Sequence, residues 1–181
     1  MGFIEDGKGR GYKAEVNAEQ ELVVRAIQTS ELEHASGVLG TGYAWSSGDL
    51  DIDAGDTMLF IKNTASTALI LDSLNLSGSN VICQWTVAIG SATTTPTGTT
   101  VNAVNLNRTF SQAQANALAF SDETAVADGD TLFTVWTGIT STVIVSLVGV
   151  ILGKNHYIQI NQETESTSGA AHVCGHFEQV S

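Results

Sequence analysis

Basic residues are scarce in this chain, and their scarcity excludes one class of partner. Lys and Arg together number 7, against 19 Asp and Glu, so the formal net charge is -12 at pH 7. A nucleic-acid-binding protein needs a basic surface that displaces counterions from phosphates. A negative field of this size repels phosphates instead, and we expect no nucleic acid among the partners.

Cysteines and long apolar segments are also rare. Cys83 and Cys174 are the only cysteines, too few for a disulfide framework, which favours synthesis and folding in a reducing cytoplasm. The longest apolar run, Val143 to Leu152, is interrupted by Ser146 and is far shorter than the roughly 20 residues that cross a bilayer. The first residues lack the basic and apolar regions of a signal peptide. We therefore expect neither a membrane segment nor a membrane partner.

Charged residues make up only 14% of the chain, and Thr, Ser, Asn and Gly take their place. That composition is typical of turns and half-buried sheets, whereas a helical domain would contain more Lys, Glu and Ala. The clearest strand is Val81 to Ile89, in which apolar residues alternate with more polar ones. A period of two buries one face of a strand. The other expected strands are Met58 to Ile61, Leu69 to Leu71, Leu132 to Trp136, Val143 to Leu152 and Tyr157 to Ile160.

This number of short strands in one domain predicts an all-β fold, specifically a jelly-roll-like β-sandwich. Residues 112–120 are expected to form a loop that crosses between the sheets. We place the β-sandwich domain at residues 37–181 and an N-terminal arm and hairpin at residues 1–36.

The N-terminal arm differs from the rest of the chain in flexibility and charge. Glycines alternate with polar residues from Gly7 to Gly11, and two short β-prone runs, Tyr12 to Val16 and Leu22 to Ile27, surround a polar turn. Such a pattern predicts a hairpin, followed by one helical turn capped by Ser30. Four of the seven basic residues fall in this region: Lys8, Arg10, Lys13 and Arg25. They are either a solvated hairpin surface or an arm that docks on an acidic partner.

Two clusters contain residue types that bind metals. Asp49, Asp51 and Asp53 would share one face of a strand and could contribute to a Ca²⁺ site, but the run does not match the EF-hand template and supplies too few oxygens. His172, Cys174 and His176 would line one strand face and have ligand types that suit Zn²⁺, but no fourth ligand is evident. A solvated strand face and a subunit contact are the alternative interpretations. We predict neither a metal site nor a cofactor, and the two clusters leave ion binding open.

No motif of a catalytic site is evident. The sequence has no Gly-x-Ser-x-Gly elbow and no phosphate-binding loop, so we predict that the protein is not an enzyme. Trp85 and Trp136 occur in apolar strand patterns and are expected in the core. Trp45 lies in a Ser- and Gly-rich stretch and is the tryptophan expected at the surface, where it could stack on a sugar.

Four stretches of the sequence resemble tailed-bacteriophage virion proteins. The first is Ile4 to Val16, with its Asp-Gly-x-Gly-x-Gly segment leading into a lysine-bearing strand, and the second is Leu22 to Ala26, with its arginine. The others are Gly98 to Arg108 and the ending His172 to Glu178.

The resemblance implies a capsid decoration (cement) protein, often a homotrimer, which binds the major capsid protein on the outside of the virion and stabilises the shell. The residues expected to contact that partner are Lys8, Arg10, Tyr12, Lys13 and Arg25. The alternative is a receptor- or glycan-binding accessory module, such as a head fibre or a tail component.

Overall fold

The computed structural model describes residues 3–5, 13–15, 30–78, 80–91, 98–107, 109, 115–122, 126 and 129–178. The chain divides into two compact units, residues 1–30 and 31–181. In the first unit, strands β1 (Phe3–Glu5) and β2 (Lys13–Glu15) pair antiparallel, with Ile4 opposite Ala14. Part of the predicted strand at 12–16 is thus β2, and the predicted strand at 22–27 lies outside the described residues.

The second unit begins with a short helical segment. Helix α1 (Glu31–His34) continues into the π-helical turn η1 (Ala35–Leu39). The segment ends at Gly40, whose φ of 67° lies in the left-handed region that glycine adopts without strain. The helical turn predicted after Ser30 is therefore present, and it belongs to the second compact unit, residues 31–181.

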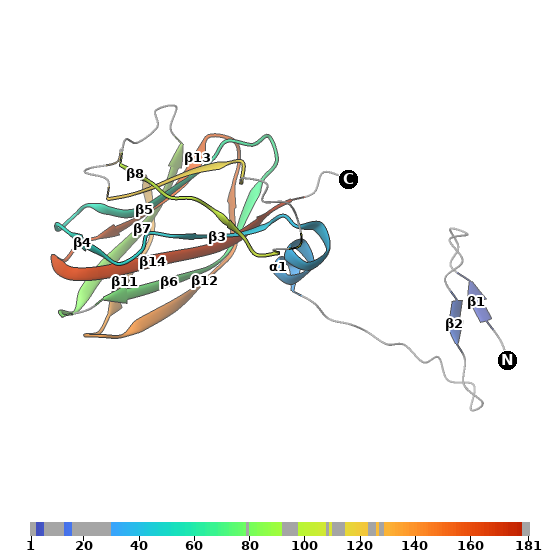
Figure 1. Cartoon of the computed structure of the whole chain (residues 1–181), viewed down its shortest axis with the longest axis horizontal. Helices are drawn as coiled ribbons and strands as arrows, with labels where there is room; N and C mark the ends of the chain where they lie inside the picture. The colour runs from blue at the N-terminus through green and yellow to red at the C-terminus, as the bar shows by residue number, and fades with distance from the viewer. Residues whose placement is uncertain are drawn as a thin grey trace. The chain divides into compact units, whose positions relative to one another are not determined.

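In the rest of the described chain, all regular secondary structure is strand, as predicted (Figure 1). The strands are β3 (Gly42–Ser46), β4 (Leu50–Ile52), β5 (Thr57–Asn63), β6 (Leu69–Gly78), β7 (Cys83–Ser91), β8 (Thr99–Thr100), β9 (Val104–Asn105), β10 (Ala117–Ser121), β11 (Asp130–Thr137), β12 (Thr142–Leu152), β13 (His156–Gln162) and β14 (Ser166–Phe177).

These strands form two antiparallel sheets, the architecture of a β-sandwich. The first has the order β11-β7-β13-β5-β10-β8 and the second the order β12-β6-β14-β3-β9, with β4 also paired to β14. All six strand predictions for the β-sandwich domain correspond to strands of these sheets, namely β5, β6, β7, β11, β12 and β13. One prediction was wrong: residues 117–121 form β10, which pairs with β5, rather than part of a crossing loop.

The core lies between the two sheets and follows the period of two that the sequence predicted. In β7, Cys83, Trp85 and Val87 are fully buried, whereas Ile82, just before the strand, is exposed. Burying a large aliphatic side chain contributes about 1.5–3 kcal/mol, so this face is a main source of stability. Both sheets contribute to the core, which includes Trp45, Leu59, Leu71, Leu74, Ile158, Ile160 and Val173.

The predicted positions of two tryptophans were wrong. Trp45 is only 1% exposed, because it lies in β3 opposite Val173, whose side chain is also in the core. Trp136 is 57% exposed. Its neighbour Val135 lies opposite Trp85 and faces the core, so the pleat of β11 turns Trp136 to the outside.

Candidate interaction surface

Strands β11 and β12 form one side of the sandwich and have an unusually apolar exterior. Each is the last strand of its sheet, they follow one another in the chain, and they contact each other. Residues 131–152 contain no Asp, Glu, Lys, Arg or His. Six large apolar side chains in this segment are exposed, and we call them the apolar border: Leu132, Trp136, Ile139, Ile144, Val148 and Ile151.

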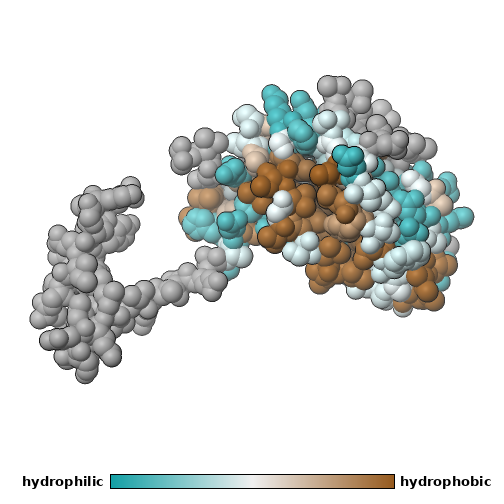
Figure 2. Space-filling view, turned by 180° about the vertical axis from the view of Figure 1, so that it is seen from behind, coloured by the Kyte–Doolittle hydropathy of each residue, from teal (hydrophilic) through white to brown (hydrophobic). Residues whose placement is uncertain are grey.

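The alternation along β12 explains why this strand has two apolar faces. Val145 and Val150 pack against the core, while Ile144 and Ile151 point away from it. Val148 is 82% exposed, at an irregularity in the pairing with β6 where Gly149 has a φ of 95°. Figure 2 shows hydrophobic residues gathered on the sandwich surface seen from behind, reaching the lower edge where β12 lies in Figure 1. The signal in the sequence was an apolar run without alternation, which usually marks a strand buried on both faces.

His172, Cys174 and His176 do share one face of β14, on the outside of the sandwich. Their neighbours Val173 and Phe177 are core residues, so the pleat turns these three outward. His176 is nevertheless 5% exposed, and its Nδ1 lies 2.9 Å from Oδ2 of Asp72. Residues two apart on a strand are separated by about 6.6 Å, too far for three in a row to bind one ion. Within the described residues, no group of three suitable side chains could hold a metal ion.

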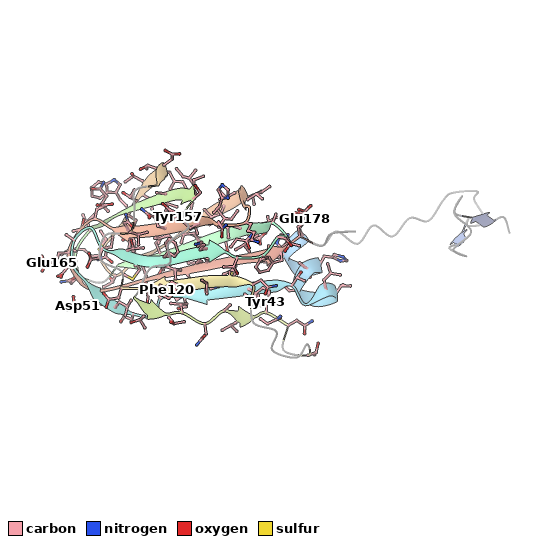
Figure 3. All side chains as sticks on the ribbon, turned by 90° about the horizontal axis from the view of Figure 1, so that it is seen from above. Tyr43, Asp51, Phe120, Tyr157, Glu165 and Glu178 are labelled. Carbon is pink, nitrogen blue, oxygen red and sulfur yellow. The ribbon has the colours of Figure 1, made fainter. Side chains whose placement is uncertain are left out.

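The acidic cluster is arranged differently from the prediction. Asp51 lies in β4, but Asp49 and Asp53 lie outside it, and all three side chains are exposed. The hydroxyl of Ser168 donates a hydrogen bond to the Asp49 carboxylate. Asp51 and Glu165 lie at one end of the sandwich (Figure 3). The structure thus favours a solvated acidic surface for this cluster.

Another aspartate near this cluster has a perturbed pKa. Partial burial raises the pKa of Asp56, and the nearby carboxylates of Asp53 and Asp122 raise it further. Like charges close together disfavour ionisation. This group too falls outside any set that could hold a metal ion among the described residues.

The Cys174 thiol is half-buried on the outer face of β14. Burial raises its pKa, the Asp72 carboxylate adds to that effect, and a hydrogen bond with Ser73 opposes it. The thiolate is the reactive form of cysteine, so this environment makes Cys174 a poor nucleophile.

We expect both thiols of the folded protein to react slowly with a disulfide reagent at pH 7.5. The rate for Cys174 should be below that of the unfolded chain, because thiolate formation is suppressed, and its pH profile should shift to higher pH. A Cys83→Ser variant isolates the Cys174 signal, since Cys83 is fully buried. Labelling of the folded variant as fast as that of the denatured chain would contradict this assignment.

Most residues of the predicted partner-binding arm lie outside the described residues: Lys8, Arg10, Tyr12 and Arg25. Lys13 is the exception, and its backbone lies in β2 opposite Glu5. In the described part of the chain, no helix is long and apolar enough to cross a membrane. Comparison with protein-family models, with curated proteins and with solved structures found no match to this chain.

Proposed function

We propose that this protein is a structural component of a phage virion, a decoration protein that binds the outer capsid surface as a homotrimer and stabilises the shell. The observation that supports this most is the division of the chain at residue 30 into a small N-terminal unit and a β-sandwich. The first 30 residues contain four basic and five acidic residues, whereas residues 31–181 contain three basic and fourteen acidic ones. The two units therefore suit different tasks.

The N-terminal unit is suited to strand pairing with a partner. Strands β1 and β2 have three residues each and form a two-stranded sheet. A sheet of that size is marginally stable in water, and it gains backbone hydrogen bonds when a partner's sheet edge extends it. In this proposal the partner is the major capsid protein. Charge complementarity to it comes from Lys8, Arg10, Lys13 and Arg25, and apolar contact with it comes from Tyr12.

The acidic sandwich is suited to remaining soluble before assembly, because a net charge far from zero keeps copies apart. Two antiparallel sheets are also the general architecture of the jelly roll, which we include in the proposal. The alternative of a glycan-binding module depended on an exposed Trp45. That side chain is 1% exposed, so the leading sugar-stacking candidate is lost.

Deletion of residues 1–27 tests the capsid-binding role. The core cluster of the sandwich comes from residues between Tyr43 and Phe177, so we expect the truncated chain to remain folded. Loss of several strand-pairing hydrogen bonds, each worth about 0.5–1.5 kcal/mol, should weaken binding by about 100-fold or more. Binding is measured by co-sedimentation with capsids assembled from the major capsid protein of the same virus.

A charge-only variant separates the two contributions of the arm. Replacing Lys8, Arg10, Lys13 and Arg25 by Ala should cost less than the deletion, because exposed ion pairs contribute at most about 1 kcal/mol each. Lys154→Ala, at an exposed position in the sandwich, is the control and should leave binding unchanged. A truncated chain that decorates capsids with full affinity would refute the role of the arm.

A further inference from the structure

We propose that the apolar border is the surface through which copies of this chain bind one another, with the outer face of β11 in one copy packed against the outer face of β12 in the next. This inference assigns a surface to self-association, and it rests on the homotrimer in the proposed function. It uses residues of the sandwich that capsid binding through the N-terminal unit does not involve.

These edge strands carry little of the protection against association that charged residues and proline provide. Natural proteins cover the edges of their sheets or place Lys, Pro or other charged residues along them. Strand β12 is 11 residues long, and neither it nor the turn at 138–141 contains a proline or a charged residue. Only the irregularity between Ser146 and Val150 interrupts the edge. A long apolar edge of this kind is prone to association with another chain.

Exposed apolar side chains are also concentrated at this side of the sandwich. Six of the eleven exposed large hydrophobic side chains in the described residues lie between Leu132 and Ile151. The two most exposed of all, Ile144 and Val148, are both on β12. Contiguous apolar surface on a soluble protein marks an interaction site, and Trp136 is of the residue type that most often dominates binding energy.

The charge distribution of the chain favours a second copy as the partner. Residues 31–181 carry fourteen acidic and three basic residues, so the net charges of two sandwiches repel one another. The apolar border is an uncharged surface on which copies can meet without opposing like charges. A basic partner would gain no complementary contact there, whereas a second copy presents the same apolar surface.

The arrangement of the two faces favours a ring. Residues 138–141 carry the chain from the first sheet to the second, so Trp136 and Ile144 lie near this turn but on the outer faces of different sheets. Trp136 lies opposite Gln84 of β7, and Ile144 opposite Asn75 of β6. Packing the outer face of β11 in one copy against the outer face of β12 in the next is a heterologous contact. Such contacts build a ring, for example a trimer, when the rotation between copies closes, and an open filament when it does not.

The first test is the mass of charge variants of the full chain by size-exclusion chromatography with light scattering. We expect the wild type at three times its 19.0 kDa chain mass. The double variant Ile144→Lys, Val148→Lys should be monomeric at the same concentration. Its affinity between copies should be weakened by roughly 100-fold or more, because each lysine must be desolvated in the contact. Val38→Lys, at a position 62% exposed in η1, is the matched control and should remain trimeric.

The second test follows the fluorescence of the wild-type chain and compares it with one conservative border variant, Trp136→Phe. Trp45 and Trp85 are buried within the sandwich, so Trp136 is the tryptophan whose exposure changes on association. Acrylamide quenching of the trimer should match that of a Trp136→Phe variant. Dilution below the dissociation constant should increase quenching in the wild type, and this increase should be absent in the variant.

Several outcomes would overturn the inference. The first is a wild type that is monomeric, and the second is a wild type that is dimeric, because a dimer would place like faces together. The third is a lysine double variant that stays trimeric. Protection of Trp136 only after capsids are added would identify the capsid as the occupant instead. A monomeric wild type that still binds capsids through residues 1–27 would refute this inference but leave the proposed capsid role intact. A trimer that depends on the apolar border but does not bind capsids would support this inference and refute the capsid role.

Discussion

Replacing Trp85 by Ala is expected to lower the free energy of unfolding by about 3–5 kcal/mol, the usual loss for a large buried aromatic side chain. Trp85 is fully buried in β7, and its indole Nε1 donates a hydrogen bond to Oγ1 of Thr137, 3.0 Å away. The substitution therefore leaves a cavity between the sheets and also an unpaired hydroxyl in β11. Both effects reduce stability in the same direction.

Trp136→Ala is the matched control, because the same side chain is removed from the outer face of β11. Its cost should stay within about 0.5 kcal/mol, as for most surface substitutions. The stability of an oligomer depends on concentration, so both substitutions are compared by urea unfolding in the Ile144→Lys, Val148→Lys background. Equal losses for the two tryptophans would contradict the assigned register of β11.

Gly175→Val should be the other strongly destabilising substitution, with a loss of about 3 kcal/mol or more. Gly175 lies in β14 between β6 and β3, where the pairing with β6 shifts register. A Cβ atom at this position would lie 2.6 Å from the carbonyl oxygen of Ile70 and 3.4 Å from Cα of Leu71. These are backbone atoms in the middle of a sheet, so they cannot move aside without breaking the pairing.

Gly37→Ala is the control for the loss of a glycine. A Cβ atom at Gly37 meets nothing within 4 Å, so this substitution should be neutral or slightly stabilising through the unfolded chain. Urea unfolding of both variants, with circular dichroism as the signal, measures the difference. A Gly175→Val variant as stable as Gly37→Ala would show that β14 and β6 are further apart than described.

Much of the fold was predictable because its signals are local. The alternation from Val81 to Ile89 identified both the strand β7 and its buried face, including Trp85. The strands β5, β6, β11, β12 and β13 were predicted from short runs of apolar and β-branched residues. Strand β10 was missed because its run Ala117–Ser121 is short and only moderately apolar.

The candidate interaction surface was less predictable. The sequence indicated two candidate sites, the N-terminal arm and the group His172, Cys174 and His176. It correctly predicted that these three residues share one strand face. It could not show that His176 would be buried beside Asp72, because those residues are 104 positions apart in the chain. The runs that form the apolar border were predicted only to be strands, because an apolar run does not reveal which of its faces is covered.

The sequence by itself determined that this protein is all-β, that it is acidic, and where most of its strands lie, because composition and the period of two act over a few neighbouring residues. Only the tertiary structure decided that Trp45 is in the core and Trp136 outside, and that β11 and β12 are edge strands. The physical reason is that a strand's buried face and its place in a sheet depend on partners distant in the chain. Trp136 faces outward because Val135 pairs with Trp85, fifty positions away, and a shift of one residue in that pairing would exchange the two faces.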